Sequence, residues 1–464
     1  MSAGASETIW DRTRLGITIG SVVLIFLAAI EALAVTTVMP VVSADLHGEA
    51  LYGLAFSGTL ATSVIGMVAA GTWSDRSGPR APLYTAVALF AVGLLVSGLA
   101  PDMYTFILGR LIQGLGVGGQ TVALYVVVAR VYPSHLHGRI FAAYAAAWVV
   151  PSMIGPFLAG VVTEFLHWRW TFLGVAVLIV AAFLLVMQRL SDVSLDSDAD
   201  GTPAPPDAAG DGGGAGTRFA TRMLLAVVVA VCAVGVGVAA DLPPVAGGPL
   251  AVAGTAVIGI ALLPLVPKGT LRAAPGLPSV VLTRGLIAGA FFAAEAFIPK
   301  LLMDDYGFTP SIAGLALTVS ALGWSGASAV QGRYGDRLGS RRIMLITFTL
   351  VMVALVCVLL VIAVWRAPWL IVIGWGFAGA GMGLLYPWLT VLTLAYSTPR
   401  NEGFNSSALS ISDATGSALA VAIAGLGFIA LPLLGSGFVT VYLVAAVLLL
   451  LALVPGLRMG AGRR

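Results

Sequence analysis

Three acids and one arginine interrupt long apolar stretches of the chain, namely Glu31, Arg110, Glu295 and Asp413. If these stretches cross a membrane, a carboxylate at the bilayer centre costs about 2.5–3.5 kcal/mol on insertion scales. A buried carboxyl group can exchange protons near neutral pH, and an arginine in a low-dielectric site requires a carboxylate partner. The four residues therefore predict proton-linked chemistry inside a membrane, and they form the candidate proton-coupling set.

Two of these positions have a simpler alternative explanation. Arg110 lies six residues from the start of its apolar run at Tyr104, so it could instead be an anchor that extends toward the outer surface. Glu295 lies four residues before Pro299, about one turn from the end of its run. It could therefore be an interfacial carboxylate, or one at which a substrate enters.

Asp413 is surrounded by hydroxyl groups, since Ser410, Ser412 and Thr415 lie within three residues of it. These neighbours could satisfy the carboxylate locally, which is the alternative to a functional role. The chain contains no nucleophile–base set, metal cluster or nucleotide-binding loop, so an enzyme is not expected. The four histidines have no metal-ligand spacing, and we expect neither a metal nor a cofactor.

The composition places most of the chain in lipid. Of the 464 residues, 59% are hydrophobic and 10% are charged, and the mean hydropathy is +1.00. A soluble domain is typically about 45–50% apolar and about 25% charged. The sequence therefore predicts an all-α polytopic membrane protein, and a nucleic-acid partner is not expected.

Apolar runs long enough to span a bilayer are arranged as six, two and six, which predicts fourteen crossings. A first bundle is expected over 1–188, a flexible cytoplasmic linker over 189–222, two extra helices and a loop over 223–278, and a second bundle over 279–464. About twenty of the 24 basic residues fall on one side if both termini are cytoplasmic, as the positive-inside rule requires. Loop charge does not distinguish twelve crossings from fourteen, because removing both central helices preserves the parity.

The two bundles carry an internal repeat of one segment, 261 positions apart. The first copy is Gly71-Thr-Trp-Ser-Asp75-Arg76-Ser-Gly78-Pro-Arg80, and the second is Gly332-Arg-Tyr-Gly-Asp336-Arg337-Leu-Gly339-Ser-Arg341. Duplicated helical blocks are typical of secondary transporters, whose halves rock about a central site.

Both copies resemble the G-x-x-x-D-R-x-G-x-R loop between helices 2 and 3 of the major facilitator superfamily. The resemblance extends over twelve core helices. It implies a gating role for Gly71, Asp75, Arg76, Gly78, Arg80, Asp336, Arg337 and Arg341. Charges in such a loop can latch the cytoplasmic side by pairing with a neighbouring helix end.

Two further segments resemble signatures of the same superfamily. Arg110, Gln113, Gly114 and Gly116 match R-x-x-Q-G-x-G, which is associated with proton-coupled members. The helix-5 segment resembles the antiporter pattern G-x-x-x-G-P-x-x-G-G in Gly155, Pro156 and Gly160, whereas Pro151 and Ala159 replace two of its glycines.

The resemblance implies the drug:proton antiporter branch in its fourteen-helix form, a multidrug exporter of two six-helix bundles related by a pseudo-two-fold axis, plus two extra central helices. Helix 1 neighbours helix 4 in this superfamily, so we expect Glu31 to pair with Arg110. The expected activity is proton-driven antiport of amphiphilic molecules such as drugs, by a monomer in the bacterial plasma membrane.

Other activities remain open. The same fold could export a lipid or a secondary metabolite, or it could take up a nutrient as a proton symporter or facilitator. A lipid-handling or sensory protein that no longer drives antiport is a further alternative, in which the two extra helices form a lateral wall or a partner surface.

Overall fold

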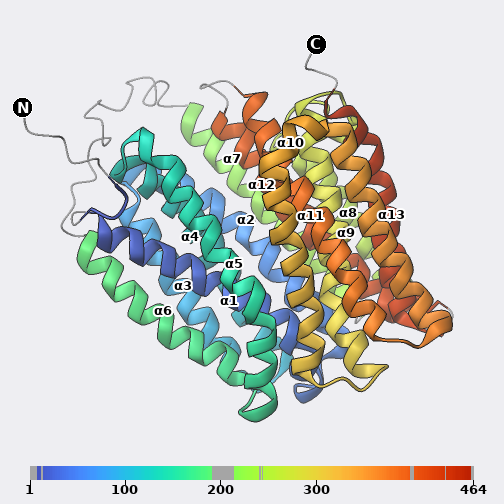
Figure 1. The fold of residues 1–464 in the computed structure, drawn as a ribbon. Helices are drawn as coiled ribbons and strands as arrows, with labels where there is room; N and C mark the ends of the chain where they lie inside the picture. The colour runs from blue at the N-terminus through green and yellow to red at the C-terminus, as the bar shows by residue number, and fades with distance from the viewer. Residues whose placement is uncertain are drawn as a thin grey trace, which may run out of the picture.

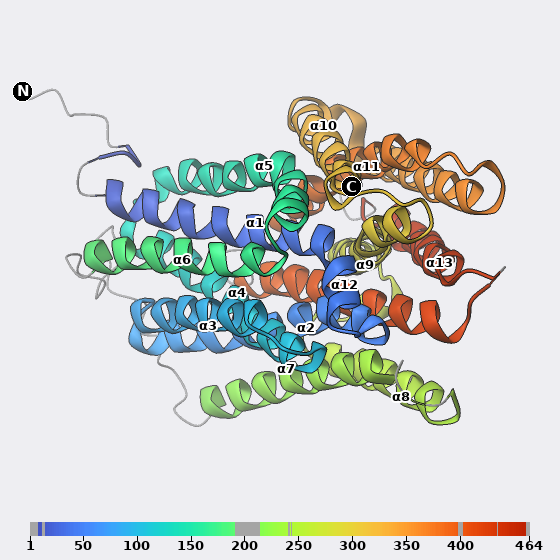
Figure 2. The ribbon, with the colours of Figure 1, turned by 90° about the horizontal axis from the view of Figure 1, so that it is seen from below.

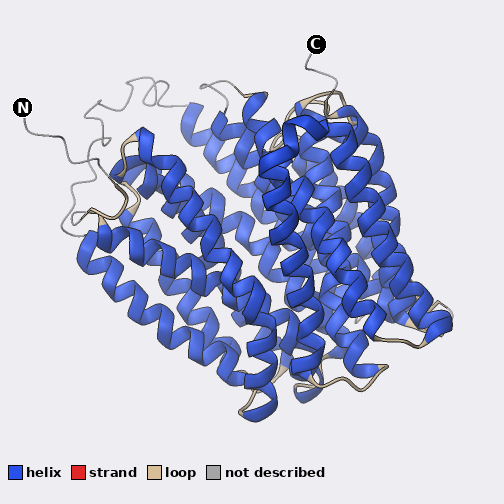
Figure 3. Ribbon diagram, viewed as in Figure 1, coloured by secondary structure: helices blue, strands red, loops and turns tan. Residues whose placement is uncertain are grey.

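The computed structural model describes residues 8–11, 14–190, 214–239, 242, 244–397, 402–433 and 435–460, and their secondary structure is helical (Figure 3). In lipid every backbone N–H and C=O must be satisfied within the protein, and a helix does so within one segment. The first half contains α1 (Leu15–Asp45), α2 (Tyr52–Ser77), α3 (Arg80–Gly98), α4 (Met103–Val131), α5 (Ser134–Phe165) and α6 (Arg169–Leu190). The second half contains α9 (Leu277–Asp304), α10 (Pro310–Leu360), α11 (Trp369–Ala395), α12 (Glu402–Ala430) and α13 (Gly437–Arg458), and α7 (Gly214–Val238) and α8 (Pro244–Leu262) lie between the halves in the chain.

The helices run between two opposite sides of the molecule. α1 begins at the left of Figure 1 and α13 ends at its top right; we call the side that carries these two ends the terminal side and the opposite one the far side. α9 also begins on the terminal side, because the Gly276 N–H donates to the Arg458 carbonyl at the end of α13. The depth of every buried charge can therefore be read from its position along its helix.

The internal repeat has the same backbone conformation in both halves. Gly78 (φ 77°, ψ 168°) separates α2 from α3, and Gly339 (φ 70°, ψ 162°) breaks α10 at the equivalent position. Glycine adopts this positive φ without the steric penalty of a Cβ atom. The two repeated segments, which resemble loops in sequence, are therefore mostly helical and turn at a single glycine. Helix extends to this glycine because each residue added to a helix gains one hydrogen bond.

Ten helices in the described part of the chain are long and apolar enough to cross a membrane, and α10 is counted once although Gly339 divides it. α6, α7 and α8 have shorter apolar parts, at Arg169–Leu184, Met223–Val238 and Ala246–Leu262. Fourteen crossings therefore stays a prediction.

The predicted linker at 189–222 is too long. α6 continues to Leu190 and α7 begins at Gly214, while residues 191–213 lie outside the described part of the chain. Hydropathy detects only the lipid-embedded part of a helix, whereas helical hydrogen bonding continues into polar residues such as those of 217–222.

The two extra helices lie along one edge of the molecule, beside α2 and α12 (Figure 2). Ala230 of α7 packs in one apolar cluster with Ala61 of α2 and Ala418 of α12. α7 therefore contacts both halves and covers the seam between them.

The halves meet closely on the far side, where α5 approaches α10 (Figure 1). The Tyr52 hydroxyl donates to the Ala296 carbonyl at 2.7 Å, and the Ser311 hydroxyl donates to Glu164 Oε2 at 2.7 Å. A Cβ added to Gly160 would lie only 2.5 Å from the Ser311 Cα. Backbone contact through small residues is a common means of helix association in membranes, and it holds the far side closed.

Gly160→Ala should therefore open the far side, because the added methyl group would meet backbone atoms that cannot move aside. We expect spin labels at Glu49→Cys and Asp305→Cys, in a background without Cys232 and Cys357, to report a longer or broader distance distribution. The matched control is Gly155→Ala, where the added Cβ meets only Leu33 Cβ at 3.9 Å. Equal distributions for both variants would contradict the role of Gly160.

Candidate functional site

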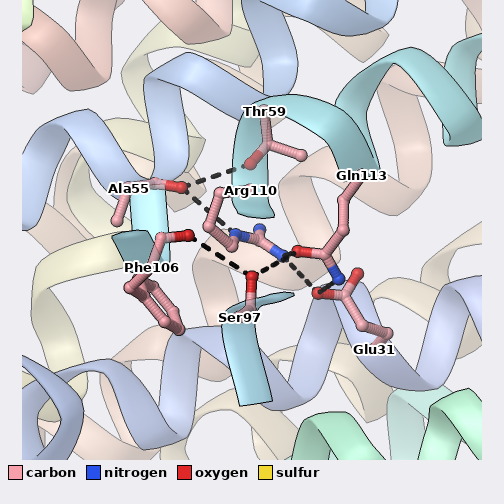
Figure 4. Close-up of polar contacts among 7 residues, drawn as sticks. All are labelled: Glu31, Ala55, Thr59, Ser97, Phe106, Arg110 and Gln113. Carbon is pink, nitrogen blue, oxygen red and sulfur yellow. Dashed lines mark hydrogen bonds and ion pairs between the residues drawn. The ribbon is translucent and has the colours of Figure 1, made fainter. Parts of the chain in front are cut away.

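Glu31, Arg110 and Gln113 form a buried polar cluster in the first half (Figure 4). Arg110 Nη1 donates to Glu31 Oε1 and, at 2.8 Å, to Gln113 Oε1, while Gln113 Nε2 donates to Glu31 Oε1 at 3.3 Å. Arg110 Nε donates to the Ala55 carbonyl of α2 at 3.3 Å. Glu31 is 2% exposed and Arg110 is 4% exposed. The arginine is thus an interior ion-pair partner and not a surface anchor.

The local sequence of α4 sets this geometry. Arg110 and Gln113 are three residues apart, so both side chains lie on one helix face. A Cβ at Gly114 would lie 2.3 Å from the Thr59 carbonyl oxygen, and one at Gly116 would lie 2.5 Å from the Phe90 amide. The two glycines therefore bring α4 against α2 on one side and α3 on the other.

The start of α4 is capped by Asp102, whose carboxylate accepts from the Thr105 amide at 2.9 Å. This backbone hydrogen bond lowers the pKa of Asp102, which lies in the exposed turn before the helix. An ionised N-cap stabilises a helix through its unpaired amides and its dipole. The cap thus fixes where the helix begins, and with it the depth of Arg110.

Glu295 of α9 lies against Trp375 of α11, whose Nε1 donates to Glu295 Oε2 at 3.2 Å. At an offset of 265 residues, Gly114 and Gly116 of α4 match Gly379 and Gly381 of α11, and Arg110 matches Trp375. In each half the residue at this position, Arg110 or Trp375, therefore donates to a carboxylate, but only Arg110 of the first half is charged. Glu295 has no ion-pair partner within the described part of the chain.

Asp413 of α12 binds Arg284 and Tyr386, so the alternative that neighbouring hydroxyl groups satisfy it is wrong. Arg284 Nη2 donates to Asp413 Oδ2 at 2.9 Å, and the Tyr386 hydroxyl donates to Asp413 Oδ1 at 2.8 Å. Ser410 and Ser412 donate to backbone carbonyls instead. Because a hydroxyl on a helix readily reaches a carbonyl one turn back or on an adjoining helix, it need not serve a nearby carboxylate.

Arg284 is the residue that sequence reasoning missed. It lies in the second bundle expected over 279–464, in the apolar run that also contains Glu295, and a charge inside such a run is the signal that could have identified it. The distribution of basic residues that favours cytoplasmic termini predicts Lys300 in an outside-facing loop. It instead lies inside α9, 2% exposed, and its Nζ pairs with Asp304 Oδ2 at 2.8 Å.

The repeated segment is anchored by an arginine of α4 in the first half. Arg130 Nη2 donates to the Ser74 carbonyl at 3.3 Å near the end of α2, a contact that the sequence did not predict. The side chains of Asp75 and Arg76 lie outside the described part of the structure, and those of Asp336, Arg337 and Arg341 are exposed. Gating by the eight segment residues stays a prediction.

Two of the helix-5 residues, Pro156 and Gly160, lie at the contact between the halves. Pro151, Gly155, Pro156 and Gly160 are all buried in α5. A Cβ on Gly314 of α10 would lie 2.6 Å from the Pro156 carbonyl oxygen. The antiporter-like segment therefore contributes to the far-side closure through backbone contacts.

Comparison with known proteins identifies the family. The model of the Major Facilitator Superfamily matches residues 21–293 and 280–460. The chain belongs to the Major Facilitator Superfamily. A member of this superfamily is a transporter and not an enzyme.

Curated relatives match only part of the chain. A transporter of the acurin A biosynthesis cluster from Aspergillus aculeatus is 31% identical over 176 residues, which cover 37% of this chain and 32% of that protein. An uncharacterised transporter of the superfamily from Mycobacterium tuberculosis is 31% identical over 163 residues, 34% of this chain and 24% of that protein. The chain thus matches about a third or less of these relatives' length.

Solved structures share the fold across nearly the whole chain. An auto-inhibited peptide transporter of the POT family has a TM-score of 0.68 at 16% identity, covering 96% of this chain and 97% of its own. A D-xylose–proton symporter has a TM-score of 0.63 at 13% identity, covering 94% and 96%. At these identities the likeness establishes the fold alone.

The buried pair should behave as one unit in a double-mutant cycle. Arg110→Gln leaves the Glu31 charge buried without a partner, and we expect it to lower the free energy of unfolding by about 3–5 kcal/mol. Adding Glu31→Gln should restore part of this loss, as measured by denaturation of the purified protein in detergent. Glu295→Gln, which breaks no ion pair, is the control and should cost less than about 1 kcal/mol. Simple additivity of the two substitutions would contradict the contact.

Proposed function

We propose that this superfamily member exports amphiphilic small molecules in exchange for protons. The observation that carries the proposal is the buried cluster of Glu31, Arg110 and Gln113 between α1 and α4. A proton on Glu31 removes the negative charge that neutralises Arg110, so the arginine must then find another partner. Proton binding is thereby linked to the packing of α1 against α4.

The closed far side supports a direction for the cycle. With both termini cytoplasmic, as the distribution of basic residues favours, the far side faces outward. The protein is then closed to the outside, and substrate binds from the cytoplasm. After the halves rock, protons from outside bind the exposed carboxylate as substrate leaves, and one charge moving down about 100 mV contributes about 2.3 kcal/mol.

The second half supports an amphiphilic substrate. Phe291, Trp324, Trp375 and Tyr386 form an uninterrupted row of rings among few charges. Aromatic and apolar side chains with a few placed polar groups are typical of sites for small organic ligands. We propose a monomer in a bacterial plasma membrane, driven by the proton gradient without a metal or cofactor.

Export of a secondary metabolite is the second candidate. It is favoured by the acurin A cluster transporter, whose name associates that relative with a biosynthetic gene cluster. A drug and a secondary metabolite share the same amphiphilic chemistry, so a screen of dyes, antibiotics and polyketide-like compounds distinguishes them by the compound that is transported fastest.

Proteoliposomes test the proposed coupling directly. An imposed proton gradient should accelerate transport of a fluorescent amphiphilic dye against the proton flow. Glu31→Gln should slow this gradient-driven flux at least about tenfold, because loss of a proton-transfer group typically costs about a hundredfold or more in rate. Glu49→Gln is the matched control, because this acid is exposed on the far side.

Two results would contradict the proposal. Wild-type flux that is equally fast with and without the gradient would exclude proton-driven antiport. Flux in Glu31→Gln that responds to the gradient as strongly as the wild type would exclude Glu31 as the coupling residue.

A further inference from the structure

Asp413, Tyr386 and Arg284 form a second charged site, on three different helices of the second half. The guanidinium of Arg284 stacks on the Tyr386 ring, with its central carbon 3.4 Å from the ring centroid. The same guanidinium donates to Asp413 Oδ2 at 2.9 Å and to the Tyr386 carbonyl at 3.2 Å. A carboxylate, the face of an aromatic ring and a backbone carbonyl thus surround one planar cation.

These three groups are the usual elements of a receptor for organic cations. An aromatic face attracts a cation through its quadrupole, and a carboxylate adds charge and direction. The Tyr386 hydroxyl donates to Asp413 Oδ1 at 2.8 Å and so fixes the carboxylate independently of the arginine. The receptor would keep its shape without Arg284.

Arg284 fills this site incompletely. A guanidinium has five N–H donors, and its Nε and one terminal nitrogen form an edge that matches a carboxylate in two places. Of the guanidinium nitrogens only Nη2 donates to Asp413, while the buried Nε has no hydrogen-bond partner. A buried donor without a partner costs free energy, so the tethered cation is held less well than a free one could be.

A row of rings extends the site along the second half. Tyr386 contacts Trp324 with centroids 5.0 Å apart, Trp324 contacts Phe291 at 5.6 Å, and Phe291 stacks on Trp375 at 5.5 Å with an interplanar angle of 17°. Trp375 in turn donates to Glu295. The row therefore connects two carboxylates through contacting rings, of which Phe291 and Trp375 are buried and Trp324, next to Tyr386, is half-buried. Trp324 is thus the ring beside Tyr386 that an aromatic cation could reach.

The site is within reach of a ligand and is absent from the internal repeat. The side chains of Arg284 and Asp413 retain 15% and 25% of their exposure. In the first half, Ile25 matches Arg284 at the offset of 259 residues that aligns Pro40 with Pro299, and Trp148 matches Asp413 at an offset of 265, so the duplicated scaffold does not require the pair.

We propose that Asp413 and Tyr386 form a binding subsite for a planar aromatic cation, and that Arg284 is a tethered occupant which the substrate displaces. The proposal rests on export of amphiphiles as the function and names the cationic ones as the substrate class. Arg284 is seven residues from the start of α9, roughly 10 Å from the terminal side. Its long side chain can therefore extend toward water there when the substrate occupies Asp413.

Binding of two dyes to the purified full-length protein in detergent tests this subsite without any gradient. The probes are ethidium, a planar aromatic cation, and Nile red, a neutral dye of similar size. Arg284→Gln should tighten ethidium binding about fivefold, the factor expected if the tethered cation occupies the site about 80% of the time. Nile red binding should not change.

The carboxylate is tested in the same background. Arg284→Gln/Asp413→Asn should weaken ethidium binding at least about tenfold relative to Arg284→Gln alone, because the charge that holds the cation is lost. A structural brace would produce the opposite pattern, in which Arg284→Gln weakens both dyes equally. That result would overturn the proposal, as would ethidium binding that Asp413→Asn leaves unchanged.

Arg284→Lys covers the case in which the glutamine variant does not fold. Lysine keeps the charge but cannot stack flat on Tyr386. Ethidium should therefore bind more tightly than to the wild type, by less than the factor of about five expected for Arg284→Gln. Unchanged or weaker ethidium binding in this variant would also reject the subsite. Because no gradient is applied, absence of proton-driven transport would leave these binding results standing.

Discussion

A charge inside the membrane must be neutralised within the protein, and the internal organisation of this transporter depends on that constraint. Glu31 meets Arg110 across α1 and α4, and Asp413 meets Arg284 across α12 and α9. Because each pair joins two helices, a change in charge at one partner alters the packing of both. Proton binding and helix movement are therefore linked by the cost of leaving a buried charge unpaired.

A transporter also requires that its halves can meet and separate, and small residues make this possible here. At Gly160 and Gly314 the far-side contacts are made with backbone atoms of the other half. Such a surface packs closely but holds the halves by dispersion and isolated hydrogen bonds. α7 covers the seam with alanine and valine, so the two extra helices can contact both halves without polar links among the clustered residues.

The duplication explains what is shared by the halves and what is not. Gly78 and Gly339 have nearly identical backbone angles, because both copies of the segment need the same turn between antiparallel helices. Arg110 and Trp375 occupy equivalent positions and each donates to a carboxylate, yet only one of them is charged. The scaffold is thus symmetric, whereas the chemistry is divided between an ion-pair cluster in one half and an aromatic row in the other.

Much of this organisation follows from the residues alone. Hydropathy, the repeat and the Gly-Pro segment predict the helical fold, the two halves and four of the charged residues inside the membrane, Glu31, Arg110, Glu295 and Asp413, because each of these is a local property of the chain. The partners of those charges are not local. Asp413 has three hydroxyl neighbours in sequence but binds Arg284, which is 129 residues away, and Tyr386. Arg284 has no distinctive neighbours in the chain, and only the packing of α9 against α11 and α12 gives it a role. Helix packing decides which buried charges meet, since a charged side chain inside the membrane binds the groups that neighbouring helices place at the same depth.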